Sequence, residues 1–146
     1  MGVYTGLYTS PQPFTRKGNF CVAFEALMQY TDLVLLDIKH IDNQVHKQLT
    51  GWENEHILDC ARYLSDIKKP VWIRYVLVPG INDDDESLYK LRAFISTLDN
   101  IERIEVLPYH DLGVYKWEQL GIPYTLSDVK PPTKKSVLHA QEILMK

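Results

Sequence analysis

The chain has 146 residues, of which 45% are hydrophobic and 24% are charged, and its formal net charge at pH 7 is -3. This length fits one ordinary domain or a piece of a larger one, and the composition excludes a disordered tail, a nucleic-acid binder that relies on bulk charge and a membrane-surface protein. No stretch reaches the apolar length of a membrane span, and the N-terminus lacks the pattern of a signal peptide. We therefore expect a cytoplasmic protein with no nucleic-acid or membrane partner.

Strand and helix patterns alternate along the first half of the chain. A short β-prone run at residues 3–9 (VYTGLYT) is followed by apolar residues at helical spacing in residues 23–31. Residues 33–39 (LVLLDIK) are a nearly continuous apolar strand, and residues 56–68 have one apolar stripe that is typical of a helix. This order indicates repeated strand-helix units.

The same alternation continues in the second half. Residues 71–78 (VWIRYVLV) predict a strand, residues 84–98 a helix with acidic residues in its first turn, and residues 103–109 (RIEVLPY) a fourth strand. Thr133 is placed to cap a final helix. Near-continuous apolar strands between helices predict an α/β fold with a parallel sheet covered by helices. Periodicity alone leaves two architectures open, a small doubly wound sheet and half of a barrel.

Neither the cysteines nor the acidic run predicts a metal site. Cys21 and Cys60 lie far apart in the sequence, each inside an apolar helical pattern, so we expect two buried free thiols. Residues 83–86 (DDDE) could suggest a cation site, but they open a predicted helix. Carboxylates in a first helical turn cap backbone amides and suit the helix dipole, so we expect capping there.

Ionisable side chains occur on three neighbouring predicted strands. Alternate residues of a strand share a face, so Asp37 and Lys39 lie on one side of the second strand, and Arg74 lies in the middle of the third. We expect His110, just after the fourth strand, on the same face. Bare buried charge is costly, so these groups should pair with each other, with a ligand or with an ion. Ligands of parallel sheets bind at the carboxyl ends of the strands.

Each of these residues also has a structural interpretation. Asp37 and Lys39 can be the first solvated residues of a loop. Arg74 can form a structural salt bridge or bind an anion. His110 can bond a nearby backbone group. The pattern of residues alone does not choose between these interpretations.

Four strings of the sequence carry a resemblance to a known family. They are DLVLLDIKHID, KPVWIRYVLVPGINDDDESL, IERIEVLPYHDLGVYKWEQLG and YTLSDVKPPTKK. They resemble the carboxy-terminal half of the pyruvate formate-lyase activating enzymes, members of the radical S-adenosylmethionine superfamily, nearly continuously from about Thr31 to the end. The resemblance implies α/β parallel repeats that form about half of a partial TIM-type barrel. It also implies a single domain over residues 1–146, with a divergent segment at residues 1–20.

The resemblance implies a function as well. Such enzymes hold a 4Fe–4S cluster by three cysteines of a CxxxCxxC loop and cleave S-adenosylmethionine to a radical. That radical takes a hydrogen atom from a glycine of the partner, which the closeness of the match indicates is pyruvate formate-lyase. By resemblance, Asp37, Lys39 and His110 contact S-adenosylmethionine, and Arg74 contacts the glycine-bearing loop. Asp37 and Thr9 are implied as ligands of a monovalent cation.

The sequence departs from the family in two places. It has no CxxxCxxC motif, and its two cysteines cannot replace one in number or spacing, so we expect no iron–sulfur ligands and no cluster in this chain alone. A cofactor-binding aspartate of the family's first strand aligns with Tyr8, which cannot supply a carboxylate. Half of a barrel also leaves a sheet edge and an inner face uncovered, which predicts weak solubility or association with another chain.

Three hypotheses follow for the chain. The first is a glycyl-radical-enzyme activating enzyme that is incomplete and inactive alone. The second is a non-catalytic module that docks the partner or binds a ligand, acting with a separate chain that supplies the missing half barrel. The third is an unrelated α/β enzyme whose site consists of Asp37, Lys39, Arg74 and His110.

Overall fold

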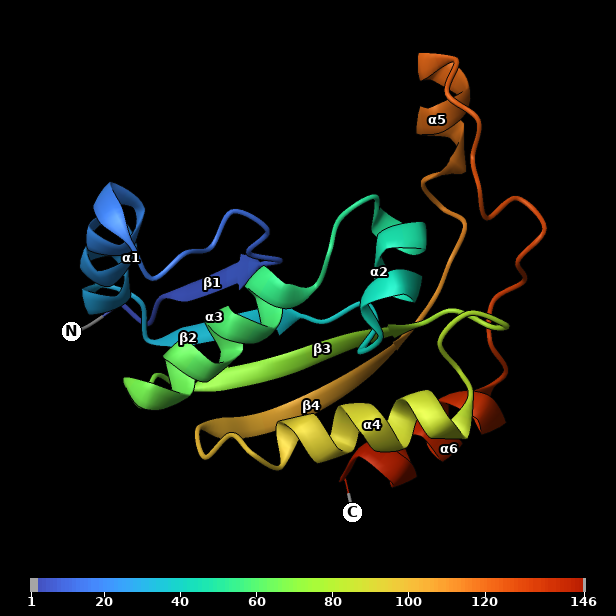
Figure 1. Ribbon diagram of the computed structural model, residues 1–146. Coiled ribbons are helices and arrows are strands. Elements are labelled where there is room, and N and C mark those ends of the chain that lie inside the picture. Colours follow the sequence, from blue (N-terminus) through green and yellow to red (C-terminus); the bar gives the residue numbers. More distant parts are fainter. Residues whose placement is uncertain (1–2, 146) are drawn as a thin grey trace.

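Four parallel strands form one sheet. The computed structural model describes residues 3–145, so Met1, Gly2 and Lys146, which the expected domain includes, lie outside the described residues. The strands lie in the order β1-β2-β3-β4, and every neighbouring pair is parallel. Their bounds are Gly6–Thr9 (β1), Leu33–Asp37 (β2), Val71–Leu77 (β3) and Ile101–Pro108 (β4) (Figure 1). Each strand overlaps a strand that the sequence predicts.

Six helices accompany the sheet within residues 3–145. Their bounds are Gly18–Gln29 (α1), Asn43–Thr50 (α2), Glu55–Asp66 (α3), Asp85–Ile95 (α4), Val114–Leu120 (α5) and Lys134–Met145 (α6). Four of them, α1, α3, α4 and α6, confirm helices expected from the periodicity. The short helices α2 and α5 were not predicted, because α2 is mostly polar and α5, with seven residues, is too short to show a helical period clearly. None of the helices in this range combines the length and apolar character needed to cross a bilayer.

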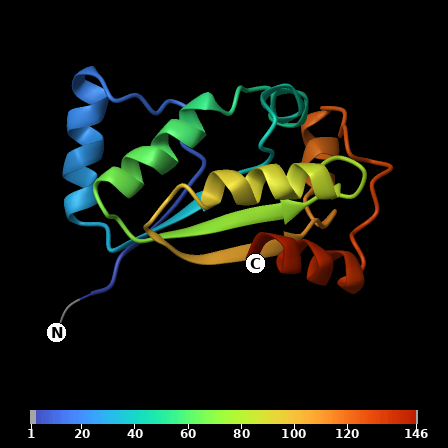
Figure 2. The same cartoon turned by 60° about the horizontal axis from the view of Figure 1, so that its bottom comes forward.

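One face of the sheet carries the hydrophobic core. Val34, Leu36 and Ile73 point to this face and are fully buried there. The core also contains side chains of α1, α3, α4 and α6, so these four helices cover the same face. Figure 2 shows α3 and α4 lying along the strands on this side. Burial of apolar area on this face is the main favourable contribution to folding.

Polar side chains fix the starts of two predicted helices. The Oδ1 atom of Asp84 accepts a hydrogen bond of 2.9 Å from the backbone N–H of Ser87, and the Oγ1 atom of Thr133 accepts one of 3.1 Å from the backbone three residues on. Asp83 Oδ1 accepts from the backbone N–H of Gly80 at 2.7 Å. The acidic run therefore caps a helix and closes a turn, and Thr133 caps the final helix, as predicted.

A β-bulge between β3 and β4 sets which side chains of β4 face away from the core. Val71 pairs with Ile101, whereas the next residue, Trp72, pairs with Arg103, so Glu102 is the extra residue of β4. A bulge shifts the alternation of one strand relative to its partner. Beyond it, the odd-numbered residues of β4 lie on the face opposite the core.

The segment that contains α5 stands away from the sheet (Figure 1). Its large apolar side chains are exposed, and they are Leu112, Tyr115, Trp117, Leu120 and Ile122. A hydrogen bond of 2.8 Å between the hydroxyl groups of Tyr109 and Tyr124 ties the segment back to the end of β4. The segment is therefore held at its base, while its apolar surface remains exposed in the described chain.

We expect Leu36→Ala to lower the free energy of unfolding by about 3 kcal/mol, because it leaves a cavity in the core under β2. Leu112→Ala removes the same atoms from a side chain that is 75% exposed and should change the free energy by less than about 0.5 kcal/mol. Urea unfolding of both variants measures the difference. Equal losses would show that the core does not lie where the structure places it.

Candidate functional site

Charged side chains line the face of the sheet opposite the core, which we call the open face. By strand register, the open face carries Tyr8, Leu35, Asp37, Trp72, Arg74, Arg103 and Glu105. Asp37, Arg74 and Glu105 are direct neighbours on β2, β3 and β4. Arg74 Nη1 lies 3.9 Å from Asp37 Oδ1, and Arg74 Nε lies 3.9 Å from Glu105 Oε2. The guanidinium group is thus held between two carboxylates.

A second cation lies beside each of these carboxylates. Lys39 Nζ donates to Asp37 Oδ2 at 3.0 Å, and Arg103 Nε lies 3.3 Å from Glu105 Oε1. The side chains of Asp37, Arg74 and Glu105 are 25%, 27% and 24% exposed, so solvent screens them less than it screens a surface ion pair. The open face therefore carries alternating charges across three strands, in partial isolation from water.

Aromatic rings lie under both arginines. The Arg74 guanidinium lies 5.2 Å from the ring centroid of Tyr8 on β1, and that of Arg103 lies 4.8 Å from the ring centroid of Trp72 on β3. These are cation–π distances. Tyr8 thus occupies the β1 position of the open face that neighbours Leu35, and it contacts Arg74 through its ring.

Two polar atoms of the site lack a hydrogen bond. Asp37 Oδ1 and Arg74 Nε are both buried and have no hydrogen-bond partner among the described residues. A buried polar atom without a partner costs free energy, which a ligand, an ion or a water molecule that pairs with it can recover. An acceptor and a donor that remain free near one another can receive a ligand that has both a cationic and an anionic or carbonyl group.

Two buried asparagines position the loops at the ends of β2 and β3. The Nδ2 group of Asn82 donates to the backbone oxygens of Lys39 and Val76, each at 2.9 Å, and its Oδ1 atom accepts from the N–H of Val78 at 2.7 Å. Asn54 donates to the oxygens of His40 and Ile41 at 3.1 and 2.7 Å. These bonds attach the segment after Asp37 to the β3–α4 loop and to the start of α3.

His40, which follows Lys39, is a buried structural residue. Its Nδ1 atom accepts a hydrogen bond of 2.9 Å from the backbone N–H of Asp42, and its side chain is only 2% exposed. Burial lowers the pKa of His40 below its ordinary value, and the nearby carboxylates of Asp42 and Asp84 offset this only in part. The imidazole therefore favours its neutral form in the folded chain.

The structure brings Asp37, Lys39 and Arg74 together but leaves two other predicted residues apart. His110 is exposed, two residues beyond β4, and no hydrogen bond or ion pair within residues 3–145 joins it to Asp37 or Lys39. The side chain of Thr9 is in register with Leu36, on the helix-covered face, where it lines a groove beside α1. Thr9 and Asp37 therefore point to opposite faces.

The sequence reasoning missed Glu105. Strict alternation along β4 places Ile104 and Val106 on the same side as His110, but the register pairs Ile104 with the buried Ile73, so this side faces the core. The bulge at Glu102 decides the face. The alternation of Arg103 and Glu105 with apolar residues was the available signal, because charged residues avoid a core.

The cysteines do not fit an iron–sulfur site. Cys60 is buried in the core, where burial raises the pKa of its thiol to about 12, and Cys21 is a half-buried free thiol on α1. A metal ligand must be a thiolate, which this environment disfavours at Cys60. Within residues 3–145, no group of three or more histidine, cysteine or acidic side chains is arranged to hold a metal ion.

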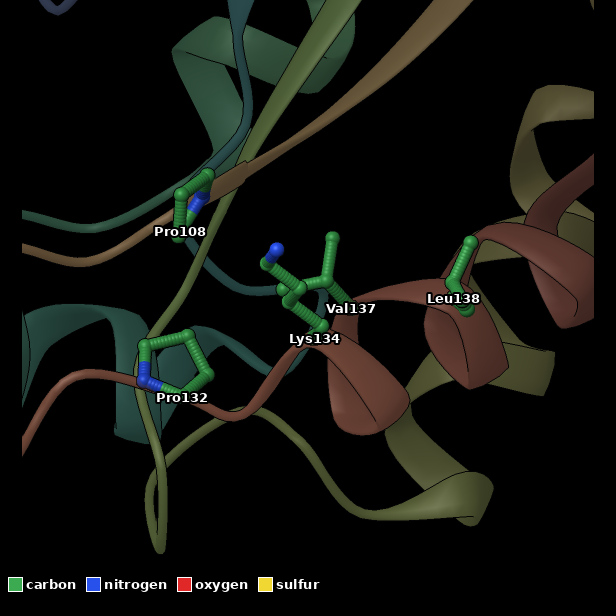
Figure 3. Close-up of a pocket in the computed structure, with 5 residues that line it drawn as sticks. All are labelled: Pro108, Pro132, Lys134, Val137 and Leu138. Atoms are coloured by element: carbon green, nitrogen blue, oxygen red, sulfur yellow. The ribbon is translucent and has the colours of Figure 1, made fainter.

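An apolar pocket lies between the end of β4 and the start of α6. It has a volume of about 390 Å³ and is lined by Pro108, Pro132, Lys134, Val137 and Leu138 (Figure 3). Its one ionisable lining residue is Lys134, so the pocket has little to offer acid–base or charge-stabilising chemistry. The charged side chains of the open face therefore remain the better candidate site.

A sequence profile of the Radical SAM superfamily matches residues 4–92, which is more than half of the 146 residues. The chain belongs to the radical SAM superfamily. This membership removes the hypothesis of an unrelated α/β enzyme. It also confirms the superfamily to which the sequence resemblance points.

Two curated relatives are similar to the chain over nearly its whole length. The chain is 56% identical over 139 residues to a pyruvate formate-lyase-activating enzyme of Staphylococcus epidermidis, a match that covers 95% of the chain and 55% of the relative. It is 52% identical over 143 residues to the enzyme of the same name from Streptococcus mutans, covering 98% of the chain and 54% of the relative. The chain thus spans about half the length of these relatives.

Solved structures show the same fold. A domain of a pyruvate-formate lyase-activating enzyme from Bacteroides vulgatus superposes with a TM-score of 0.75 at 23% identity, covering 98% of the chain and 76% of that domain. A radical SAM methyltransferase from Sphaerobacter thermophilus superposes with a TM-score of 0.64 at 17% identity, covering 96% and 37%. The α/β parallel repeats expected from the sequence, part of a TIM-type barrel, are thereby confirmed.

The burial of His40 should make the free energy of unfolding depend on pH. The unfolded chain binds a proton at this imidazole as the pH falls below about 6.5, whereas the folded chain resists it, so the free energy of unfolding should fall between pH 7 and pH 5. His40→Asn keeps an acceptor near the Nδ1 position and should flatten this dependence. Denaturant unfolding at several pH values measures it, with the exposed His110→Asn as the control. An unchanged slope in His40→Asn would contradict the assignment.

Proposed function

We propose that the chain is the carboxy-terminal part of an activating enzyme for a glycyl radical enzyme, and that its open face supplies side chains for S-adenosylmethionine and for the partner. The observation that carries this proposal is the pair of free, buried atoms Asp37 Oδ1 and Arg74 Nε, placed on neighbouring strands of a radical SAM fold. The names of the relatives support pyruvate formate-lyase as the partner.

S-adenosylmethionine fits the charges at the end of β2. The molecule has a cationic sulfonium, an ammonium and a carboxylate, so it needs both carboxylate and cationic partners. Asp37 supplies the carboxylate and Lys39 supplies the cation, and Lys39 Nζ lies 3.0 Å from Asp37 Oδ2. We assign His110 to the same ligand because it follows the carboxyl end of β4, the end at which ligands of parallel sheets bind. An exposed imidazole there can close on a ligand as a donor or an acceptor.

Arg74 is assigned to the partner. Its Nε–H group has no hydrogen-bond partner, and a guanidinium group binds the carbonyl or carboxylate oxygens of a docked peptide well. Asp37 also remains the candidate carboxylate ligand for a monovalent cation. Thr9 can contribute to such a site only through its backbone oxygen, because its side chain faces α1.

The described residues do not fit a 4Fe–4S cluster, so we route no step of the function through one in this chain. We propose that the cysteine-bearing half barrel comes from polypeptide outside these 146 residues, in the same protein or in a separate chain. The open edge of β1 and the open face are the surfaces it would cover. In isolation the chain then acts as a binding module, which is a second candidate function. Tyr8 favours this second function, because a tyrosine cannot supply the carboxylate that the family has at this position.

Binding of S-adenosylmethionine to the isolated chain tests the first part of the proposal. We expect weak binding, visible as NMR shift changes at Asp37, Lys39 and His110, and Asp37→Asn should weaken it about tenfold because one charge-assisted contact is lost. S-adenosylhomocysteine, which lacks the sulfonium charge, is the matched ligand control. The assignment fails if the ligand shifts residues elsewhere or if Asp37→Asn binds as well as the unaltered chain.

Retention of pyruvate formate-lyase on the immobilised chain tests the assignment of Arg74. Arg74→Gln should weaken retention about tenfold, since the loss of one charged hydrogen bond has that scale. Arg62→Gln removes the same charge from α3, on the helix-covered side, and should leave retention unchanged. Equal retention by the two variants would count against a role of Arg74 in docking.

A further inference from the structure

We propose that Glu105 is a positioning residue that holds Arg74 away from Asp37 and thereby keeps both Asp37 and Arg74 free to bind. The inference rests on the proposed function only for the identity of the ligands, not for the role of Glu105. Neither the sequence pattern nor the resemblance assigned a role to this side chain.

Arg74 lies midway between two carboxylates. Its Nη1 and Nε atoms lie at the same distance, 3.9 Å, from carboxylate oxygens on either side, and neither distance is a hydrogen bond. A guanidinium group beside a single carboxylate closes into a short, often bidentate pair of hydrogen bonds. Attraction from both sides therefore explains why Arg74 closes on neither carboxylate.

Asp37 has one carboxylate oxygen that is paired and one that is free. Asp37 Oδ2 already accepts from Lys39, and Oδ1 is the remaining buried acceptor without a hydrogen bond. If Arg74 lost the attraction of Glu105, it would be drawn towards Oδ1 and would satisfy that acceptor. A ligand would then have to displace the arginine, so the removal of a charge that never touches the ligand should weaken binding at Asp37.

Glu105 is itself held in position by a neighbouring arginine. Its Oε1 atom lies 3.3 Å from Nε of Arg103, whose guanidinium group lies over the ring of Trp72. Arg103 thus binds one oxygen of the carboxylate, Oε1, while the other oxygen, Oε2, faces Arg74. The bulge at Glu102 is what brings Arg103 and Glu105 to the open face. These contacts fix Glu105 in place while its Oε2 atom remains directed at Arg74.

Crystal structures of the full chain test the proposal without any ligand. In Glu105→Gln, which keeps the size of the side chain, the distance from Arg74 to Asp37 Oδ1 should fall from 3.9 Å to hydrogen-bond length. Glu102→Gln removes the same charge from an exposed residue of the same strand and should leave the distance unchanged. An unchanged distance in Glu105→Gln overturns the proposal.

A double-mutant cycle with S-adenosylmethionine as the probe tests the consequence for binding. Glu105→Gln should weaken binding about tenfold, the scale of one charged hydrogen bond, and should have almost no effect in a chain that already carries Arg74→Gln. Equal losses in both backgrounds would mean that Glu105 acts directly rather than through Arg74, which overturns the proposal. If the unaltered chain binds no S-adenosylmethionine, the proposed ligand is wrong, and the crystal structures alone decide the role of Glu105.

Discussion

The organisation of this molecule depends on a permanent charge in the middle of a strand. An arginine side chain carries a charge that is costly to bury, so the face of β3 that carries Arg74 cannot be packed against helices as the other face is. The neighbouring strands meet this constraint with a carboxylate on each side and an aromatic ring beneath the guanidinium group. The result is a sheet with two different faces. One face is apolar and is buried under helices, and the other is charged and is not covered by helices within residues 3–145.

The apolar face and the buried side chains of Asn54 and Asn82 fix the positions of the charged side chains on the open face. Val34, Leu36 and Ile73 anchor β2 and β3 to the helices, so their register is fixed by the core. Asn82 then joins the end of β2 to the loop after β3, which fixes the backbone at Lys39. A binding group is only as well placed as the backbone that carries it. The positions of Asp37 and Lys39 are therefore a product of core packing and of two buried amides rather than of the binding groups themselves.

Family membership is the background to the role that we propose for this face. The chain belongs to the radical SAM superfamily, yet it spans about half the length of its curated relatives and has two cysteines in all. What it offers is a set of charged and aromatic side chains from four strands, with no cluster ligands among the described residues. We interpret the open face as the ligand-facing and partner-facing share of a divided site. In this interpretation Glu105 attracts Arg74 from the side opposite Asp37 and so keeps the guanidinium group from closing on Asp37.

The sequence by itself determined the alternation of strands and helices, the parallel sheet and the need of Asp37, Lys39 and Arg74 for partners, because these follow from local periodicity and from the cost of burying charge. Local patterns could not predict which residues meet across strands. The bulge at Glu102 reversed the face expected for β4, which brought Glu105 beside Arg74 and left His110 outside the charged contacts. Only the tertiary structure decided this, because strand register depends on pairing with a neighbour that lies about 30 residues away in the chain. The same holds for Thr9, whose face was set by its pairing with β2.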